Sequence, residues 1–437
     1  MTEATATVDR PAHSWIPAGL AVFGVGWGAN QFASLLPVYR DHTHLSQTTV
    51  TAMFGTYAIG LIPALLVVGP VSDRLGRRRV LRPVLIASVA ATVLLIAGAA
   101  QVWLLFAGRF LAGVASGAAF GPGSAWIKEL SAGGSPGAGA RRAAISLSAG
   151  FGAGPFTAGL VAQWAPLPEV LPYLVHVALM LGITPLAWNA PETVRAARAG
   201  RADRPHRVSG AGRAVLAGPA RAVARAAGTP RFGRVVAPAA PWVFGLPTIG
   251  FTVLTGLVSG HTAGLPVAFA AVVIGLTLLA GVLVQPLAAW VEGSRPGLGM
   301  PAGLLAATVG LGLAVAVAVT TQPLLVPVAA MALGASYGIL LVSGLREVER
   351  LADPDELAGL VAVFYALTYL GFAVPYLLAE LAPHLGYPFL LAAAAILTLA
   401  TAALTAVLGR AEPEPSAPDR TGRTSPALAP APPGEHG

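Results

Sequence analysis

The stretch GPVSDRLGRRRVLRP, residues 69–83, places one acid and five arginines between two long apolar runs. The run FGTYAIGLIPALLVV precedes it, and VLIASVAATVLLIAGAA follows it. Each run, with its flanks, approaches the ~20 residues that an α-helix needs to cross the ~30 Å hydrocarbon core of a bilayer. The stretch therefore predicts a short charged turn between two membrane-spanning helices.

The composition of the whole chain agrees with a membrane protein. Its 437 residues are 55% hydrophobic and 11% charged, whereas soluble domains average about 25% charged residues. There is no cysteine, which excludes a disulfide framework and a thiolate metal site. The sequence has no HExxH, P-loop or GxSxG pattern, so we expect no enzyme and no metal site.

Apolar windows between breakers predict twelve transmembrane segments. All are expected to be helices, because backbone groups in lipid must find hydrogen bonds within their own segment. The predicted helices lie near 15–39, 46–68, 80–100, 102–127, 142–165, 170–189, 234–258, 265–290, 299–320, 324–345, 357–381 and 386–409. The predicted division of the chain is an N-terminal segment 1–14, a six-helix half 15–190, a central loop 191–233, a second six-helix half 234–410 and a tail 411–437.

Basic residues gather in alternate gaps between these helices. Five arginines occupy the first such gap and ten the central loop, while the opposite gaps offer Arg40 and otherwise only histidine. By the positive-inside rule, both termini and the central loop are predicted to be cytoplasmic, in a multi-pass protein of the cytoplasmic membrane. The net charge of +8 then marks a face against anionic lipid, so we expect the bilayer as a partner and no nucleic acid.

A faint repeat relates the two halves. GPVSDRLGRRR aligns with QPLAAWVEGSR at 285–295, and GVASG at 113–117 aligns with GASYG at 334–338. In this alignment the second copy has lost the acid and most of the arginines. Both matches fall at corresponding positions of the halves, which favours an internal duplication.

Three motifs resemble those of the major facilitator superfamily, and the resemblance covers essentially the whole chain. LFAGRFLAGVASG in helix 4 is similar to motif B of that family, with Arg109 as its arginine. The turn between helices 2 and 3 resembles motif A, through Gly69, Asp73, Arg74, Gly76, Arg77 and Arg78. GFGAGPFTAG in helix 5 resembles motif C of the drug–proton antiporter branch, through Gly150, Gly154, Pro155 and Gly159.

The resemblance implies an all-α fold of two six-helix halves and a role in transport. Within the family, motif A contacts the start of helix 11 and holds the inner side closed, and in this chain helix 11 begins near Asp353 and Pro354. We expect Asp73 with Arg77 to form this latch; the alternative is a purely local ion pair. The motif C segment is a candidate hinge around Pro155, with simple helix packing as the alternative.

Four residues are candidates for proton coupling. Motif B and the predicted helix positions point to four charged or titratable groups: Arg109, His176, Asp41 and Glu380. Helix 1 lacks the acid that many antiporters carry, so Arg109 needs another partner. The competing interpretations are an Arg109 that snorkels to the interface and a His176 that only packs.

Candidates for a substrate cavity lie in helices 1, 7 and 11. Tyr365, Tyr369 and Phe372 share one face of helix 11, and aromatic walls suit flat amphipathic ligands. Trp242 and Phe244 are two apart in helix 7 and point opposite ways, so we expect one of them to join this face. Asn30 and Gln31 lie deep in helix 1 and must find partners there. Packing between helices is the alternative for each of these residues.

The sequence thus predicts a secondary transporter that moves a small organic molecule by alternating access, as proton-coupled efflux. Uptake or facilitated diffusion of a metabolite is the first alternative, supported by the missing helix 1 acid. A receptor or scaffold without transport is the second. We expect a monomer that needs no cofactor and is driven by the proton gradient.

Overall fold

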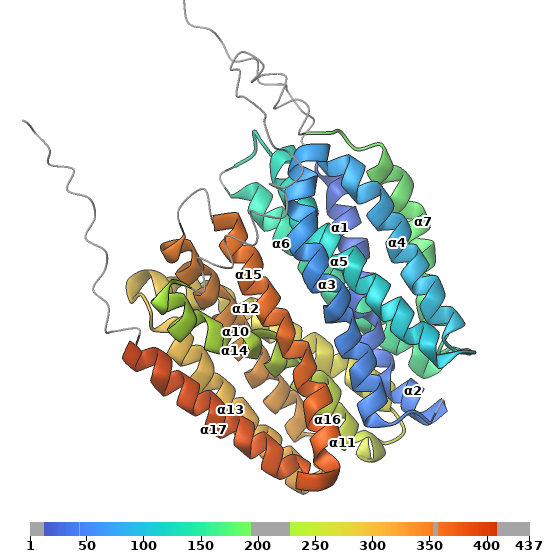
Figure 1. Ribbon diagram of the computed structural model, residues 1–437. Coiled ribbons are helices and arrows are strands. Elements are labelled where there is room, and N and C mark those ends of the chain that lie inside the picture. The colour runs from blue at the N-terminus through green and yellow to red at the C-terminus, as the bar shows by residue number, and fades with distance from the viewer. Residues whose placement is uncertain (1–12, 43, 136, 194–227, 353–356, 409–437) are drawn as a thin grey trace, which may run out of the picture.

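The computed structural model describes residues 13–42, 44–135, 137–193, 228–352 and 357–408. Within these ranges the regular elements are helices, and no strand is present. The helices stand in two bundles, an N-terminal one drawn from blue to green and a C-terminal one drawn from yellow-green to red (Figure 1). The all-α, two-bundle fold predicted from the apolar runs is confirmed.

The N-terminal bundle has six spans, and the first of them is made of three pieces. Its elements are α1 (Ile16–Asn30), the 3₁₀ segment η1 (Gln31–Leu35), α2 (Leu36–His42), α3 (Gln47–Leu75), α4 (Arg77–Ala97), α5 (Val102–Leu130), α6 (Ala138–Trp164) and α7 (Leu171–Trp188).

The C-terminal bundle repeats this count over its described residues. Its seventh span combines η2 (Phe232–Val236), α10 (Ala237–Thr248), η3 (Ile249–Leu254), α11 (Thr255–Leu257) and η4 (Ser259–His261). The remaining spans are α12 (Pro266–Ser294), α13 (Gly299–Thr320), α14 (Leu325–Leu351), then α15 (Leu357–Tyr369) with η5 (Leu370–Ala373) and α16 (Val374–Leu385), and α17 (Tyr387–Leu408).

Eleven of these spans are long and apolar enough to cross a membrane, including the seventh and the eleventh when their consecutive helical pieces are taken together. The twelfth is the first span, which is interrupted at η1 and so falls short as one helix. Proline explains two of the interruptions, because Pro37 and Pro375 cannot bond the carbonyls of Ala33 and Gly371 four residues earlier. The twelve spans agree with the prediction, and these breaks in the first and eleventh were not predicted.

The two bundles pack their helices in the same order. In the first, α3 packs on α5, α4 on α5, and α4 on α7; in the second, α12 packs on α14, α13 on α14, and α13 on α17. The bundles meet where α6 lies against α12 and where α3 lies against α15 and α16. Corresponding helices therefore make corresponding contacts, as expected of a duplicated unit.

Glycines bring the central helix pair of each bundle close together. A Cβ placed on Gly113 would lie 2.0 Å from the carbonyl oxygen of Tyr57, and one on Gly334 would lie 2.0 Å from that of Thr277. Small residues at such crossings let transmembrane backbones touch. The GVASG and GASYG segments thus occupy equivalent places, and Thr277 in α12 corresponds to Tyr57 in α3.

We call the end of the molecule that holds the α3–α4 turn the arginine end, and the opposite end the far end. Ser14 hydrogen-bonds the carbonyl of Leu130 at the end of α5, which places the start of α1 at the arginine end too. Most of the predicted segments 1–14, 191–233 and 411–437, and the start of helix 11 at Asp353 and Pro354, lie outside the described residues.

Candidate functional site

The predicted charged turn is one residue long and is built around Gly76. This glycine has φ of 105°, a left-handed conformation that side chains disfavour. It also has Glu192 beside it, since a Cβ on Gly76 would lie 2.5 Å from a carboxylate oxygen. The Glu192 carboxylate accepts hydrogen bonds from the backbone N–H groups of Arg77 (3.0 Å) and Arg78 (3.1 Å). Because an acid caps its first turn, α4 begins at Arg77 rather than near residue 80.

The Arg77 guanidinium links three helices at the arginine end. It pairs with Asp73 of α3 at 2.5 Å and with Glu129 of α5 at 2.9 Å, and it donates to the Ser72 hydroxyl at 3.2 Å. Thr193 donates a further hydrogen bond to Glu129. The predicted Asp73–Arg77 pair is present, and Asp73 remains 62% exposed. The proposed contact with the start of helix 11 falls on residues that the structure does not describe.

The other motif A residues differ in their surroundings. Arg78 donates to the Ala190 carbonyl, and Gly69 has open space beside it. Arg74 is exposed at the end of α3. Sequence reasoning missed Glu129 and Glu192 as members of this cluster. The sequence pattern that could have identified them is an isolated acid at the end of helix 4 and another just after helix 6, both at the same end of the molecule as the basic turn.

The C-terminal bundle holds a comparable cluster with an acid at its centre. Glu292, in the last turn of α12, is 1% exposed and accepts the backbone N–H groups of Gly297 and Gly299 at the start of α13. Arg350 of α14 pairs with it at 2.8 Å. Arg350 also reaches Glu347 at 3.2 Å, and Glu347 pairs with Arg231. The sequence alignment missed this acid because the α12 register is shifted by one helical turn.

Arg109 is buried in the middle of the N-terminal bundle, with 1% of its surface exposed. Its Nη1 donates to the Ala29 carbonyl at 2.9 Å, just before α1 gives way to η1. Its guanidinium carbon lies 4.6 Å from the Tyr57 ring centre, 4.9 Å from that of Phe32 and 5.4 Å from that of Phe54. The side chain points inward among aromatic faces, so the snorkelling alternative does not describe this structure.

The expected acidic partners of Arg109 lie elsewhere. Asp41 and Glu380 are exposed residues in α2 and α16, toward the far end. Among the described residues, no carboxylate pairs with Arg109. Its Nε is buried and has no hydrogen-bond partner in the described part of the chain. A buried cation without an ionic partner is costly, and cation–π contacts offset part of that cost.

His176 is fully buried and satisfied at both ring nitrogens. Its Nδ1 lies 2.8 Å from the Thr92 hydroxyl, and its Nε2 lies 3.0 Å from the Gly24 carbonyl. A carbonyl accepts only, so Nε2 carries the hydrogen and Nδ1 accepts from Thr92 in the neutral ring. Gln31 also reaches Thr92 at 3.4 Å, while its Oε1 is buried without a partner in the described residues. Asn30, the last residue of α1, is half-buried.

Aromatic rings form one connected cluster at mid-depth. Phe244 of α10 stacks on Tyr369 (4.7 Å between ring centres) and on Tyr337 of α14 (5.6 Å), and it contacts Phe372 (5.6 Å). Phe372 then meets Phe54 of α3 at 5.2 Å, which links the two bundles. As predicted, one of the two helix 7 aromatics joins the helix 11 face, and it is Phe244.

The remaining cavity candidates stand apart from that cluster. Tyr365 is half-buried and contacts the ring of Phe364. Trp242 packs on the apolar core as a partly buried residue. Tyr337, Phe54 and Tyr57 were missed in the sequence, because only the tertiary fold brings their helices to helix 11.

The motif C glycines are contact points for other helices. Cβ atoms on Gly150 and Gly154 would lie 2.3 and 2.5 Å from the carbonyl oxygens of Phe23 and Trp27 in α1. One on Gly159 would lie 2.5 Å from the Cβ of Ala271, in α12 of the other bundle. Pro155 is buried inside α6, which is a helix without interruption from Ala138 to Trp164.

Contacts that join the two bundles gather from mid-depth to the far end. Gln163 of α6 bonds the backbone N–H groups of Val267 and Ala268, and Gln47 of α3 bonds the Thr252 carbonyl. Every hydrogen bond and ring contact between described residues of different bundles lies in this part of the molecule. The far end is therefore closed.

Comparison with known proteins places this architecture in a family. A family model of the Major Facilitator Superfamily matches residues 18–343. The nucleoside transporter NupG superposes with a TM-score of 0.71 at 12% identity, over 90% of this chain and 99% of that one. A peptide transporter, POT, in complex with sulfate gives 0.70 at 16% identity, over 91% and 95%.

A POT family transporter in complex with 5-aminolevulinic acid is also similar, with a TM-score of 0.68 at 13% identity, over 91% of this chain and 95% of that one. At such identities these likenesses show the fold alone. No curated protein sequence matches the chain significantly. Through its family match, which spans most of its length, the chain belongs to the Major Facilitator Superfamily of membrane transporters.

Proposed function

We propose that this transporter exports a small organic molecule across the cytoplasmic membrane by alternating access, with protons moving inward in exchange. The closed far end supports a molecule caught on one side of such a cycle. Motif C supports the efflux branch. We also propose that the protein works as a monomer and needs no cofactor beyond the proton gradient.

In this proposal the arginine end faces the cytoplasm, together with both termini. The observation in favour is the concentration of arginine at the α3–α4 turn and in the central loop, which the positive-inside rule assigns to the cytoplasm. The closed far end is then the outer side. The closed outer side is then one state of the alternating-access cycle that we propose.

The aromatic cluster is the single observation that best supports an organic substrate. Phe244, Tyr337, Tyr369 and Phe372 form one connected cluster, which meets Phe54 of the other bundle. Transporters built from two repeats bind substrate near the bilayer midplane, where the repeats meet. Stacked rings with a few hydroxyl groups bind flat, mostly apolar molecules. We therefore propose a substrate with at least one aromatic or planar ring.

The polar groups for coupling would come from the N-terminal bundle. Arg109 Nε, Gln31 Oε1 and Trp27 Nε1 are buried without hydrogen-bond partners in the described residues. Buried polar atoms of this kind cost about 1–3 kcal/mol each when left unsatisfied, so they favour the entry of water or a polar ligand group. We propose that this polar region, with Arg109 at its centre, senses the proton.

Facilitated diffusion or uptake is the second candidate. The observation that favours it is the absence of a carboxylate beside Arg109 within the described residues, since a mid-membrane acid is the usual proton carrier. His176 is the titratable imidazole at that depth, and both its nitrogens are already engaged.

Two experiments in sequence test the proposal. Cells with and without the gene are first compared for sensitivity to a broad panel of planar organic compounds. A compound that the protein protects against is then followed in proteoliposomes under an imposed pH gradient. Export predicts accumulation that collapses when the gradient is removed. Equilibration without accumulation would instead favour facilitated diffusion.

A further inference from the structure

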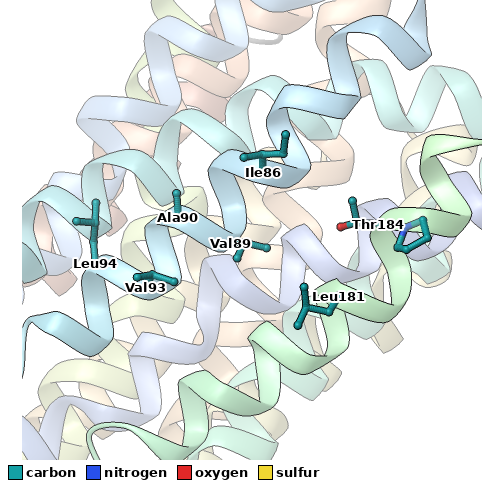
Figure 2. A pocket seen from close by; sticks show the side chains of 8 residues that line it. Ile86, Val89, Ala90, Val93, Leu94, Leu181 and Thr184 are labelled. Carbon is teal, nitrogen blue, oxygen red and sulfur yellow. The ribbon is translucent and has the colours of Figure 1, made fainter.

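A groove on the outer surface of the N-terminal bundle lies between α4 and α7. It has a volume of about 690 Å³ and is lined by Ile86, Val89, Ala90, Val93 and Leu94 of α4 and by Leu181, Thr184 and Pro185 of α7. Figure 2 shows the two helices side by side, with these side chains along the gap between them. Its walls are almost wholly apolar, and Ile86, Val93 and Leu181 are 56%, 51% and 65% exposed. In a membrane protein this surface faces lipid.

The arginine end of this groove is closed by a basic bridge. Arg82 lies one turn before Ile86 on α4, and its Nε and Nη2 donate to the Trp188 carbonyl at 3.3 and 2.7 Å. Its guanidinium carbon lies 4.8 Å from the centre of the Trp188 ring. An arginine carries five N–H donors in a fixed fork. Its Nη1 has no hydrogen-bond partner among the described residues, so part of the fork is available to an anionic oxygen.

Arg79 adds a second positive charge on the same stripe of α4. It is exposed and lies seven residues, about two turns, before Ile86. From Arg82 to Leu94 the helix rises about 18 Å, at 1.5 Å per residue. This length matches one leaflet of the bilayer, since the whole hydrocarbon core is about 30 Å thick. The groove and its basic end therefore have the length of one lipid acyl chain.

We propose that the α4–α7 groove binds one phospholipid with an anionic headgroup. An acyl chain lies along the groove, and the phosphate contacts Arg82 and Arg79. Charge complementarity selects the anionic headgroup, and the apolar walls select a lipid over a free phosphate. Basic pockets between transmembrane helices bind anionic headgroups by this chemistry.

The site has a consequence for the neighbouring charge cluster. Arg82 follows Arg77 by five residues in α4, and Trp188 precedes Glu192 by four residues after α7. A lipid in the groove therefore contacts both α4 and α7, the two helices whose ends meet through the Glu192 cap. The proposal does not depend on the substrate or on the direction of transport.

Native mass spectrometry of the purified full-length protein tests the site. The protein is titrated with dioleoyl phosphatidylglycerol, and separately with phosphatidylcholine of the same chains. We expect one phosphatidylglycerol to be retained in preference to phosphatidylcholine, and excess inorganic phosphate not to displace it. Each basic residue near an anionic lipid is worth about fivefold in affinity, so R79A should weaken retention about fivefold and R79A/R82A about 25-fold.

Two further variants keep the test decisive. Ala90→Trp fills the groove and leaves both arginines in place, so it should reduce retention of the single lipid as strongly as the arginine variants. Arg295→Ala removes an exposed arginine at the same end of the molecule but far from the groove, and it should change nothing. The proposal is wrong if the two lipids are retained equally, if inorganic phosphate displaces the lipid, or if R295A weakens binding as much as R79A. Loss with the arginine variants but not with A90W would also overturn it, because it would indicate diffuse attraction rather than a groove.

Discussion

In the N-terminal bundle, the middle of the membrane holds Arg109, His176 and Gln31, all buried. At the corresponding depth the C-terminal bundle holds the rings of Phe244, Tyr337 and Tyr369, and its described charged side chains lie at the helix ends. In α14, the position that corresponds to Arg109 of α5 holds an apolar residue, Ala330. The two bundles thus share a packing scheme and differ in what they place at its centre.

The ends of the bundles differ in a second way. The N-terminal cluster surrounds a cation, Arg77, with an exposed Asp73, whereas the C-terminal cluster surrounds a buried anion, Glu292. Only Asp73 is exposed in this pair, and solvent screening limits such a carboxylate to about 0–1 kcal/mol of stability. A buried acid with two backbone donors is a fixed structural element. We therefore expect the N-terminal end to switch during transport and the C-terminal end to hold.

The shared packing scheme predicts the largest effects, and it predicts them equally in both bundles. Gly113→Leu and Gly334→Leu each force a side chain against a backbone carbonyl that would lie 2.0 Å from its Cβ. Overpacking of this kind costs about 3 kcal/mol or more, so both variants should yield little monodisperse protein in fluorescence-detected size-exclusion chromatography. Gly312→Leu, at a glycine with open space beside it, is the matched control. A normal profile for one of the two interface variants would break the equivalence of the bundles.

Arg109 tests the polar centre of the N-terminal bundle. Lysine keeps the charge but lacks the planar fork that bonds Ala29 and lies over three rings. We expect Arg109→Lys to reach the membrane normally and to lose accumulation driven by a pH gradient about tenfold, a loss of ~1.4 kcal/mol. Substrate binding should survive better than transport. Vesicle uptake with wild-type pH dependence would reduce Arg109 to a structural residue.

A pair of isosteric variants distinguishes the roles of the two end clusters. Glu292→Gln removes the buried charge that pairs with Arg350, leaves Glu347 as the remaining acid beside it, and should lower the free energy of unfolding by about 3 kcal/mol. Asp73→Asn should lower it by at most about 1 kcal/mol, yet should strongly reduce transport. Thermal unfolding in detergent measures the first effect, and uptake into everted vesicles the second. Normal transport by the Asp73 variant would exclude its role as a latch.

The smallest expected effect concerns access to the aromatic cluster. The natural chain has no cysteine, so single cysteines report without background. Cysteine at position 365, where the tyrosine is half-buried, should react with a water-soluble thiol reagent faster than cysteine at position 369, inside the cluster. Substrate should protect both positions. Absence of labelling at either one would favour plain helix packing.

Much of the fold could be predicted from the sequence, because lipid imposes strong rules on length and charge. Twelve apolar runs were sufficient for the spans, and the resemblance to motif A for the Asp73–Arg77 pair. The helix 11 periodicity likewise predicted that Tyr369 and Phe372 share a face with one helix 7 aromatic.

Side-chain partners from distant helices could not be predicted in the same way. Glu192 caps α4 from more than one hundred residues away, and Arg109 meets Tyr57 only because Gly113 lets α5 approach α3. Glu292 escaped the repeat alignment because a shift of one helical turn leaves the apolar pattern unchanged. Such contacts depend on the register and crossing of helices, which local sequence does not encode.

Spin-label distances at the two ends of the molecule test alternating access most directly. One cysteine pair is placed at the arginine end, at Ala132 and Ser294, and another at the far end, at His44 and Gly264. In nanodiscs, we predict two populations at each pair, with opposite shifts when the pH is changed from 8 to 6: the arginine end closes as the far end opens. Asp73→Asn should change the balance at both pairs together. A single distance at each end, unmoved by pH and by Asp73→Asn, would contradict a transporter that alternates between its two bundles.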